Sequence, residues 1–292
     1  MNRLSVEKRS QILAMLCEGM SMRSVSRIAD VSINTVSKLL VDAGKFCSAF
    51  HDDNVRGVKA KRVQCDEVWS FCYAKQRNVD KAKAAPGNSG DVWTWTAIDA
   101  DSKLIVSWLV GGRDAEYAHT FMHDLAERID GRVQLTTDGL SAYINAVEGA
   151  FGADVDFAQL VKIYGEGPKT PERKYSPNEF VCAQTRPIEG SPDHKHVSTS
   201  YVERSNLTIR MAVRRYTRLT NAFSKKFENH MHMVAIYTVF YNWLRIHTTI
   251  KVTPAMEAGL SDSTMEWSDF IEAMDAATPA KKRGPYKKNN SN

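Results

Sequence analysis

The chain has 292 residues, of which 43% are hydrophobic and 25% are charged. This composition supports a packed core and excludes a globally disordered protein. The formal net charge is +5 and the pI is about 8.8, a mild basic excess, so the positions of the basic residues matter more than their number.

Targeting and redox signals are few. No apolar run reaches the roughly 18 residues that a membrane-spanning helix needs, so no membrane partner is expected. The N-terminus lacks the apolar region of a secretory signal. Five cysteines, with no Cys-x-x-Cys pair, favour a reducing compartment over a disulfide framework. We therefore expect a cytoplasmic protein.

Residues 1–45 predict a small helical domain. Ser21 can cap a second helix that turns Val25 and Ile28 inward, and Ser32 can cap a third. A short helix, a tight turn and a further helix form the helix-turn-helix pattern of DNA-binding proteins. The side chains expected to face the major groove are Ser32, Asn34, Thr35 and Lys38. The alternative interpretation is a plain three-helix bundle.

Residues 46–60 are polar and weakly periodic, which predicts a linker, and a longer domain is expected over 61–250. Its expected strands are 61–73, 91–98, 104–110, 133–137 and 155–164, and its first two helices are 114–128 and 140–151. Residues 165–200 contain five prolines and predict a loop; 201–246 predict helix, broken near Asn221. A helical extension at 251–278 and a basic tail at 279–292 follow. This element order predicts a mixed α/β fold of the ribonuclease-H-like kind.

Three acids stand where such a fold would bring them together. Asp66 lies inside the first expected strand, Asp138 closes the fourth, and Glu203 begins a late helix. A buried charge such as Asp66 is costly unless it is paired or bound to a metal. Each acid alone has an ordinary reading: Asp138 as a helix cap, Glu203 as a surface charge, and Asp66 as a neighbour easily confused with Glu67.

Carboxylate oxygens suit Mg²⁺, and a two-metal site can cleave and join phosphodiesters. In that interpretation Asp66 bridges both metals, while Asp138 and Glu203 each hold one. Arg210 follows Glu203 by seven residues, nearly on the same helix face, and could hold a phosphate.

Basic residues gather after the third acid. The chain has no acid between Glu203 and Glu228, and a basic helical strip in that stretch suits the phosphates of DNA. The residues expected to contact DNA there are Arg204, Arg214, Arg215 and Arg218. A solvated charged face is the alternative. His247 could contact DNA or cap a helix end.

These motifs together resemble a known family. Asp66 to Phe71, Thr137-Asp138-Gly139 and Glu203 to Arg210 look like the three catalytic blocks of bacterial insertion-sequence-one type transposases. The stretch from Arg218 to Lys226 is also similar to that family. The resemblance covers roughly residues 60–260. A cysteine-paired zinc motif, common before the helix-turn-helix in that family, is absent from this sequence.

The resemblance implies a DDE transposase, with a ribonuclease-H-like domain that binds, nicks and joins DNA. Asp66, Asp138 and Glu203 would hold Mg²⁺, with Mn²⁺ as a substitute. The implied partners are double-stranded DNA, as element ends and as target, and further copies of the chain; the implied location is the bacterial nucleoid. Two alternatives remain: a catalytically inactive DNA-binding regulator, and a nuclease that cuts without joining.

Overall fold

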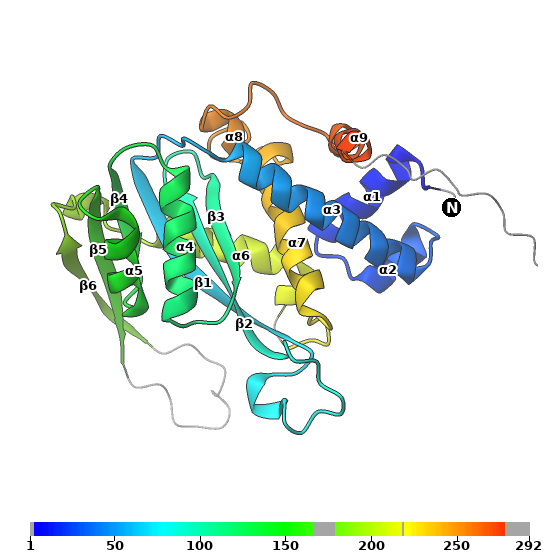
Figure 1. Cartoon of the computed structure of the whole chain (residues 1–292), viewed down its shortest axis with the longest axis horizontal. Coiled ribbons are helices and arrows are strands. Elements are labelled where there is room, and N and C mark those ends of the chain that lie inside the picture. Colours follow the sequence, from blue (N-terminus) through cyan, green and yellow to red (C-terminus); the bar gives the residue numbers. More distant parts are fainter. Residues whose placement is uncertain (1–2, 166–178, 218, 278–292) are drawn as a thin grey trace, which may run out of the picture.

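The structure, a computed structural model, describes residues 3–165, 179–217 and 219–277 (Figure 1). Its α-helices are α1 (Val6–Cys17), α2 (Met22–Ile28), α3 (Ile33–Asn54), α4 (Ala115–Arg128), α5 (Ala142–Phe151), α6 (Ser200–Ala212), α7 (Phe227–Val239), α8 (Pro254–Glu257) and α9 (Trp267–Ala277). Its strands are β1 (Arg62–Cys72), β2 (Gly90–Asp99), β3 (Ile105–Gly111), β4 (Val133–Thr137), β5 (Val155–Tyr164) and β6 (Phe180–Glu189). A π-helical segment, η5 (Phe240–Leu244), continues α7. The predicted basic tail lies outside the described residues.

The six strands form one mixed sheet in the order β3-β2-β1-β4-β5-β6. Strand β2 runs antiparallel to both of its neighbours, β1 and β3, while β4 lies parallel to β1 and β5 parallel to β4. The predicted mixed α/β class is confirmed, and the strand order is consistent with a ribonuclease-H-like fold. Because β1 and β4 are parallel neighbours, the residues that follow β4 come to lie beside the middle of β1.

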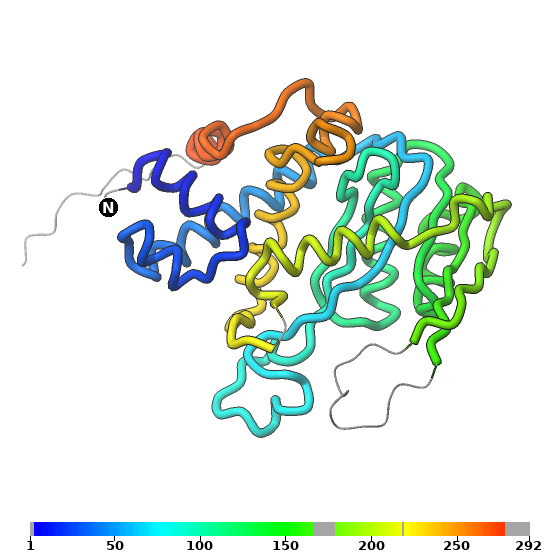
Figure 2. Tube along the Cα trace, turned by 180° about the vertical axis from the view of Figure 1, so that it is seen from behind, coloured from blue at the N-terminus to red at the C-terminus, as the bar shows by residue number. Residues whose placement is uncertain are grey.

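Helices cover both faces of this sheet. Figure 1 shows α4 and α5 in front of it, and Figure 2, from behind, shows α6 crossing the opposite face. Burial follows the same layers: Phe121 of α4 and Trp95 of β2 are fully enclosed, with their rings 5.8 Å apart.

The first three helices begin at serine caps, of which Ser21 and Ser32 were predicted. The side chains of Ser5, Ser21 and Ser32 each accept a backbone hydrogen bond from the first turn, which satisfies an otherwise unpaired N–H. Val25 is buried as predicted, but Ile28 is 62% exposed, so its predicted inward position was wrong.

Helix α3 runs on to Asn54, so most of the range predicted as a linker is helical. Cys47 and His51 are buried one turn apart on it, and Gly44 lets α7 approach closely: a Cβ there would lie 2.3 Å from the Cβ of His232. His51 approaches the Val106 carbonyl of β3, with 3.2 Å between Nε2 and the oxygen. Through His51, α3 thus reaches β3, the edge strand of the sheet.

Residues 165–200 were predicted as a loop, but they include strand β6, which pairs antiparallel with β5. Pro187 fits because the pairing register shifts next to its partner, Ala158. Nearly all of β6 is exposed on both faces, including Phe180 at 55% and Val181 at 60%. The alternation that marks a half-buried strand is therefore missing from its sequence.

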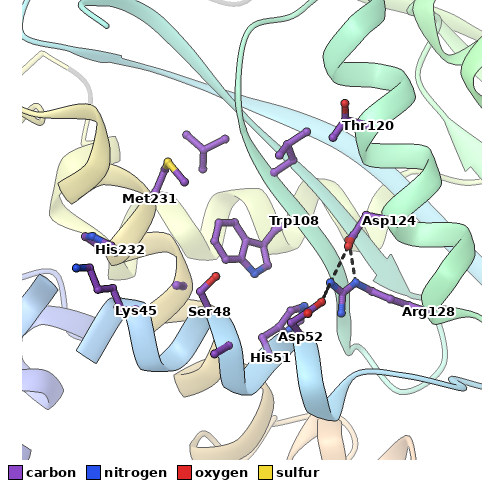
Figure 3. Close-up of a pocket in the computed structure, with 15 residues that line it drawn as sticks. Lys45, Ser48, His51, Asp52, Trp108, Thr120, Asp124, Arg128, Met231 and His232 are labelled. Carbon is purple, nitrogen blue, oxygen red and sulfur yellow. Dashed lines mark hydrogen bonds and ion pairs between the residues drawn. The ribbon is translucent and has the colours of Figure 1, made fainter. Parts of the chain in front are cut away.

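A groove of about 610 Å³ lies along the free side of β3, between α3, α4 and α7 (Figure 3). Trp108 stands at its centre, with Met231 of α7 on one side. Arg128 forms ion pairs with Asp124 and Asp52. None of the predicted site residues lines this groove.

Within the described part of the chain, every helix is too short or too polar to cross a membrane.

Candidate functional site

Asp66 lies in the middle of β1, on the face that α6 covers. Its Oδ2 accepts a hydrogen bond of 2.8 Å from the side-chain amide of Asn206 in α6. Burial raises the pKa of Asp66 to about 6, and the nearby charges of Asp138 and Glu203 act in the same direction. A carboxylate whose ionised form is disfavoured in this way is stabilised by a bound cation.

Glu67, the next residue, points to the other face, as strand geometry requires. Its side chain is 1% exposed, and it accepts hydrogen bonds from the hydroxyl of Tyr143 and from Arg113 Nε, the latter at 2.9 Å. Burial raises the pKa of Glu67 to about 7, and the charge of Asp138 adds to the rise. Glu67 was not among the predicted site residues.

Asp138 follows β4, where the chain turns toward α5. Its Oδ1 accepts the backbone N–H of Leu140 at 2.9 Å, and its Oδ2 lies 3.4 Å from Arg113. One carboxylate oxygen each from Asp66, Glu67 and Asp138 lies within 4.8 Å of the others. We call these three residues the acidic cluster. It joins two residues of one strand to a third from far along the chain.

Glu203 lies in the first turn of α6, as predicted, but outside the acidic cluster. It accepts hydrogen bonds from Lys162 of β5 and from the hydroxyl of Thr199, the latter at 2.6 Å. Its charge still contributes to the raised pKa of Asp66, so the two carboxylates are neighbours. Arg210 lies two turns further along α6 and is half-buried. The roles predicted for Glu203 and Arg210 stay predictions.

Arg113 is a second residue that the sequence analysis missed. It pairs with both Glu67 and Asp138, and its guanidinium lies 4.7 Å from the ring centre of Trp93. The preceding Gly111 has no room for a side chain, since a Cβ would lie 1.7 Å from the ring of Tyr117. A Gly-Gly-Arg sequence directly after a strand was the available signal for a residue held close to the site.

At the start of α3, three of the residues predicted to face DNA, Ser32, Asn34 and Lys38, are exposed, and Thr35 is half-buried. The Ser32 hydroxyl already accepts the backbone N–H of Thr35 at 3.1 Å, so it serves the helix as a cap. The DNA contacts predicted for Asn34, Thr35 and Lys38 stay predictions.

The predicted basic strip after Arg210 does not continue on one helix, because α6 ends at Ala212. Arg215 turns inward and donates to the Asn229 carbonyl at 2.7 Å; burial lowers its pKa to about 10. The role predicted for Arg215 as a DNA contact stays a prediction, and this inward hydrogen bond competes with it. Arg214 is half-buried in a short 3₁₀ turn, and Arg218 lies outside the described residues.

Arg204 and His247, by contrast, come together although they are distant in sequence. Both line a second pocket, beside α6. The structure thus divides the predicted DNA contacts among three places: the start of α3, the end of α6 and this pocket.

The acidic cluster can hold a divalent cation. All of its donors are oxygen atoms. Mg²⁺ and Mn²⁺ prefer oxygen ligands, whereas softer metals such as Zn²⁺ favour nitrogen and sulfur. Two of the carboxyls, Asp66 and Glu67, are buried at raised pKa. Arg113 pairs with Glu67 and Asp138 and so offsets part of the negative charge of the cluster, but it does not pair with Asp66. The donor set therefore fits a hard metal ion.

No protein-family model matches the chain, and no curated protein sequence matches it. Among solved structures, a piggyBac transposase synaptic complex with hairpin DNA is similar at 11% identity, with 94% of this chain and 71% of that chain covered and a TM-score of 0.39. A Mos1 mariner paired end complex with Mn follows at 10% identity, 82% and 77% coverage and a TM-score of 0.29. The Mos1 strand transfer complex is similar at 11% identity, with 82% of this chain and 76% of that chain covered and a TM-score of 0.24. At such TM-scores these likenesses carry no argument about the fold or the site.

Proposed function

We propose that the chain is a DNA transposase of the DDE type, which cleaves DNA and joins the cut strands to a target with the help of bound Mg²⁺. The observation that supports this function most is the acidic cluster: Asp66 and Asp138 are far apart in the sequence, yet their carboxylate oxygens lie within 4.8 Å of each other and of Glu67. Three carboxylates this close repel one another, and the single guanidinium of Arg113 offsets only part of that repulsion, so the arrangement favours metal binding over a purely structural role.

Asp66 and Asp138 would hold the metal, with Glu203 reaching the same ion or a second one. When bound, Mg²⁺ would lower the pKa of an attacking water or 3′-hydroxyl and stabilise the leaving oxygen of the phosphodiester. Asn206 would keep the Asp66 carboxylate oriented through its 2.8 Å hydrogen bond. Arg210 and Arg113 would offer cationic side chains to the reacting phosphate.

The N-terminal helices would supply sequence recognition. Asn34 and Lys38, exposed at the start of α3, would enter the major groove, as in other helix-turn-helix proteins. Pairing of two element ends would require at least two copies of the chain. Membership of the insertion-sequence-one type belongs to the same proposal and rests on the three sequence blocks around the acids.

The test uses the DNA that flanks the gene, carried on a donor plasmid, with the protein supplied separately and Mg²⁺ present. We expect nicks at the element ends and joined products, and both should disappear in Asp66→Ala. Asp80→Ala is a matched control, because Asp80 is an exposed acid in the loop before β2. Asp80→Ala should behave as the wild type.

Two other outcomes would replace the proposal. Binding to the ends without any cutting, in Mg²⁺ or Mn²⁺, would identify a regulator that has lost activity; the position of Glu203 outside the acidic cluster is the observation that favours this alternative. Cut ends without joined product would identify a nuclease.

A further inference from the structure

A pocket of about 250 Å³ lies beside α6, and no residue of the acidic cluster lines it. Helix α6 contributes one wall, the turn between β2 and β3 a second, and the segment after η5 a third. The residues on which the argument depends are Lys103, Tyr201, Arg204, Ser205, Arg245 and His247. Glu203 contacts Lys162 of β5, whereas its neighbour Arg204 faces this pocket, so the two residues point to different flanks of one helix.

The lining of this basic pocket carries positive charge and no carboxylate. Four of the lining residues are basic: Lys103, Arg204, Arg245 and His247. Lys103 is only 8% exposed; its ammonium donates to the Ala100 carbonyl and lies 3.6 Å from the ring centre of Tyr201. The structure therefore holds a cation in place where no acid of the lining neutralises it.

The four groups line one pocket. Burial lowers the pKa of His247, and the charges of Lys103 and Arg245 lower it further. Tyr241 stacks edge-on against His247, with 6.2 Å between the ring centres, which fixes the imidazole at the pocket wall. Positive charges concentrated in a concave, partly enclosed site raise the local concentration of anions.

Ser205 supplies an independent sign of a missing ligand. The residue is 3% exposed and lines the pocket, and its Oγ is buried with no hydrogen-bond partner among the described residues. A buried hydroxyl without a partner costs free energy, so such groups usually mark a site for a water, an ion or a ligand. An oxyanion would accept the hydrogen bond.

The volume of the pocket narrows the ligand class. Pockets for drug-sized ligands span roughly 300–1,000 Å³, and this one lies just below that range. A compact tetrahedral oxyanion fits better than a whole nucleotide. Guanidinium groups such as those of Arg204 and Arg245 match the geometry of phosphate oxygens.

We propose that the basic pocket binds one backbone phosphate of DNA, beside the phosphate that reacts at the acidic cluster. The inference rests on the proposed function to the extent that DNA is the substrate. Its consequence is that α6 carries two DNA contacts on different flanks, one at Glu203 and one at Arg204, so that the helix sets the path of the strand across the site.

The first measurement is the salt dependence of DNA binding in EDTA, followed by anisotropy of a labelled duplex. Each phosphate contact contributes about 0.9 to the slope of log K against log salt for duplex DNA. Arg204→Gln/Arg245→Gln should reduce the slope by about 1. Both residues are exposed, so the fold should survive. Arg77→Gln/Lys81→Gln, which removes two exposed charges from the loop before β2, is the matched control and should retain the wild-type slope.

The second measurement uses inorganic phosphate alone. The imidazole signals of His247, assigned with His247→Gln, are followed by NMR while phosphate replaces chloride at constant ionic strength. We expect a saturable shift in the wild type that disappears in Arg204→Gln/Arg245→Gln. A shift with an unchanged DNA slope would assign the pocket to a free phosphate and overturn the DNA assignment. A changed slope without a shift would place the arginines on DNA but outside a common phosphate site, and no effect in either assay would also overturn the proposal.

The assays separate this inference from the proposed function, because neither of them requires cleavage. A chain that passes both but never cuts DNA would contradict the proposed function and leave the pocket intact. A chain that cuts DNA but keeps its slope after the double substitution would do the opposite.

Discussion

Glu67→Gln tests whether burial of the Glu67 carboxyl makes the stability of the folded protein depend on pH. The ordinary pKa of this carboxyl is 4.5, and burial together with the charge of Asp138 raises it to about 7 in the folded protein. Between these two pKa values, the Glu67 carboxyl is protonated in the folded state and ionised in the unfolded state. This stabilisation is fully present below pH 4.5 and is lost as the pH rises through 7.

The magnitude follows from the shift in pKa. One pKa unit corresponds to about 1.4 kcal/mol, so the full effect is about 3 kcal/mol, of which about 2–3 kcal/mol falls between pH 5 and pH 8. Glutamine keeps the shape of the side chain and can still accept from Tyr143, but it carries no charge at any pH. The variant should therefore match the wild type near pH 5 and exceed it in stability at pH 8.

The assay is urea unfolding in EDTA at both pH values, with the two proteins compared at each. His51 and His230 are buried at pKa values lowered to about 3, so each contributes stability that is present above pH 6.5 and lost as the pH falls. Their effect is the same in both proteins and cancels in the difference. If the free energy of unfolding changed equally with pH in the wild type and Glu67→Gln, the pKa of Glu67 would not be raised in the folded protein.

Mg²⁺ should change this comparison at pH 8. A ligand that binds only the folded state at 100 times its dissociation constant stabilises it by about 2.7 kcal/mol. If the cation lies at the acidic cluster, it should raise the stability of the wild type more than that of Glu67→Gln and so narrow the gap between them. An equal gain in both proteins would place the cation elsewhere.

Two further substitutions test how the helices hold the sheet. Asn242→Ala should cost about 2–5 kcal/mol in urea unfolding, because the buried amide bonds both backbone groups of Ile105, at 3.0 and 2.9 Å, and each lost bond leaves a buried group unpaired; a loss below about 1 kcal/mol would contradict this role. Arg215→Gln should lower stability by about 1–3 kcal/mol, since the Asn229 carbonyl loses its donor, and should leave the salt slope of DNA binding unchanged. A flatter slope with intact stability would return Arg215 to the DNA surface.

Local patterns predicted most of the elements, and their failures have physical causes. The serine caps and the alternating strands β1 to β5 are short-range signals, and the structure contains them. The end of α3 was missed because its buried residues, Cys47 and His51, are small or polar and take their burial from α7 and β3. Strand β6 was missed because exposure on both faces leaves no alternating pattern.

The site shows the same division. The positions of Asp66, Asp138 and Glu203 at the ends or middle of their elements followed from the sequence. The inclusion of Glu67 did not, because it depends on Arg113 and Tyr143, which reach it from two other elements. The inward turn of Arg215 was likewise not predictable, since its acceptors, the Asn229 carbonyl and the Ser224 hydroxyl, meet it only in the folded chain.

The central claim is that the acidic cluster carries out metal-dependent DNA cleavage. The most direct test is Asp138→Asn, with nicking of the flanking DNA in Mg²⁺ and binding in EDTA measured on the same preparation. Replacing even an outer partner of a metal ligand costs about 10–100-fold in affinity or activity, so nicking should fall by at least about 100-fold while DNA affinity stays near that of the wild type. Equal nicking by Asp138→Asn, or a wild type that binds but never nicks, would contradict the account.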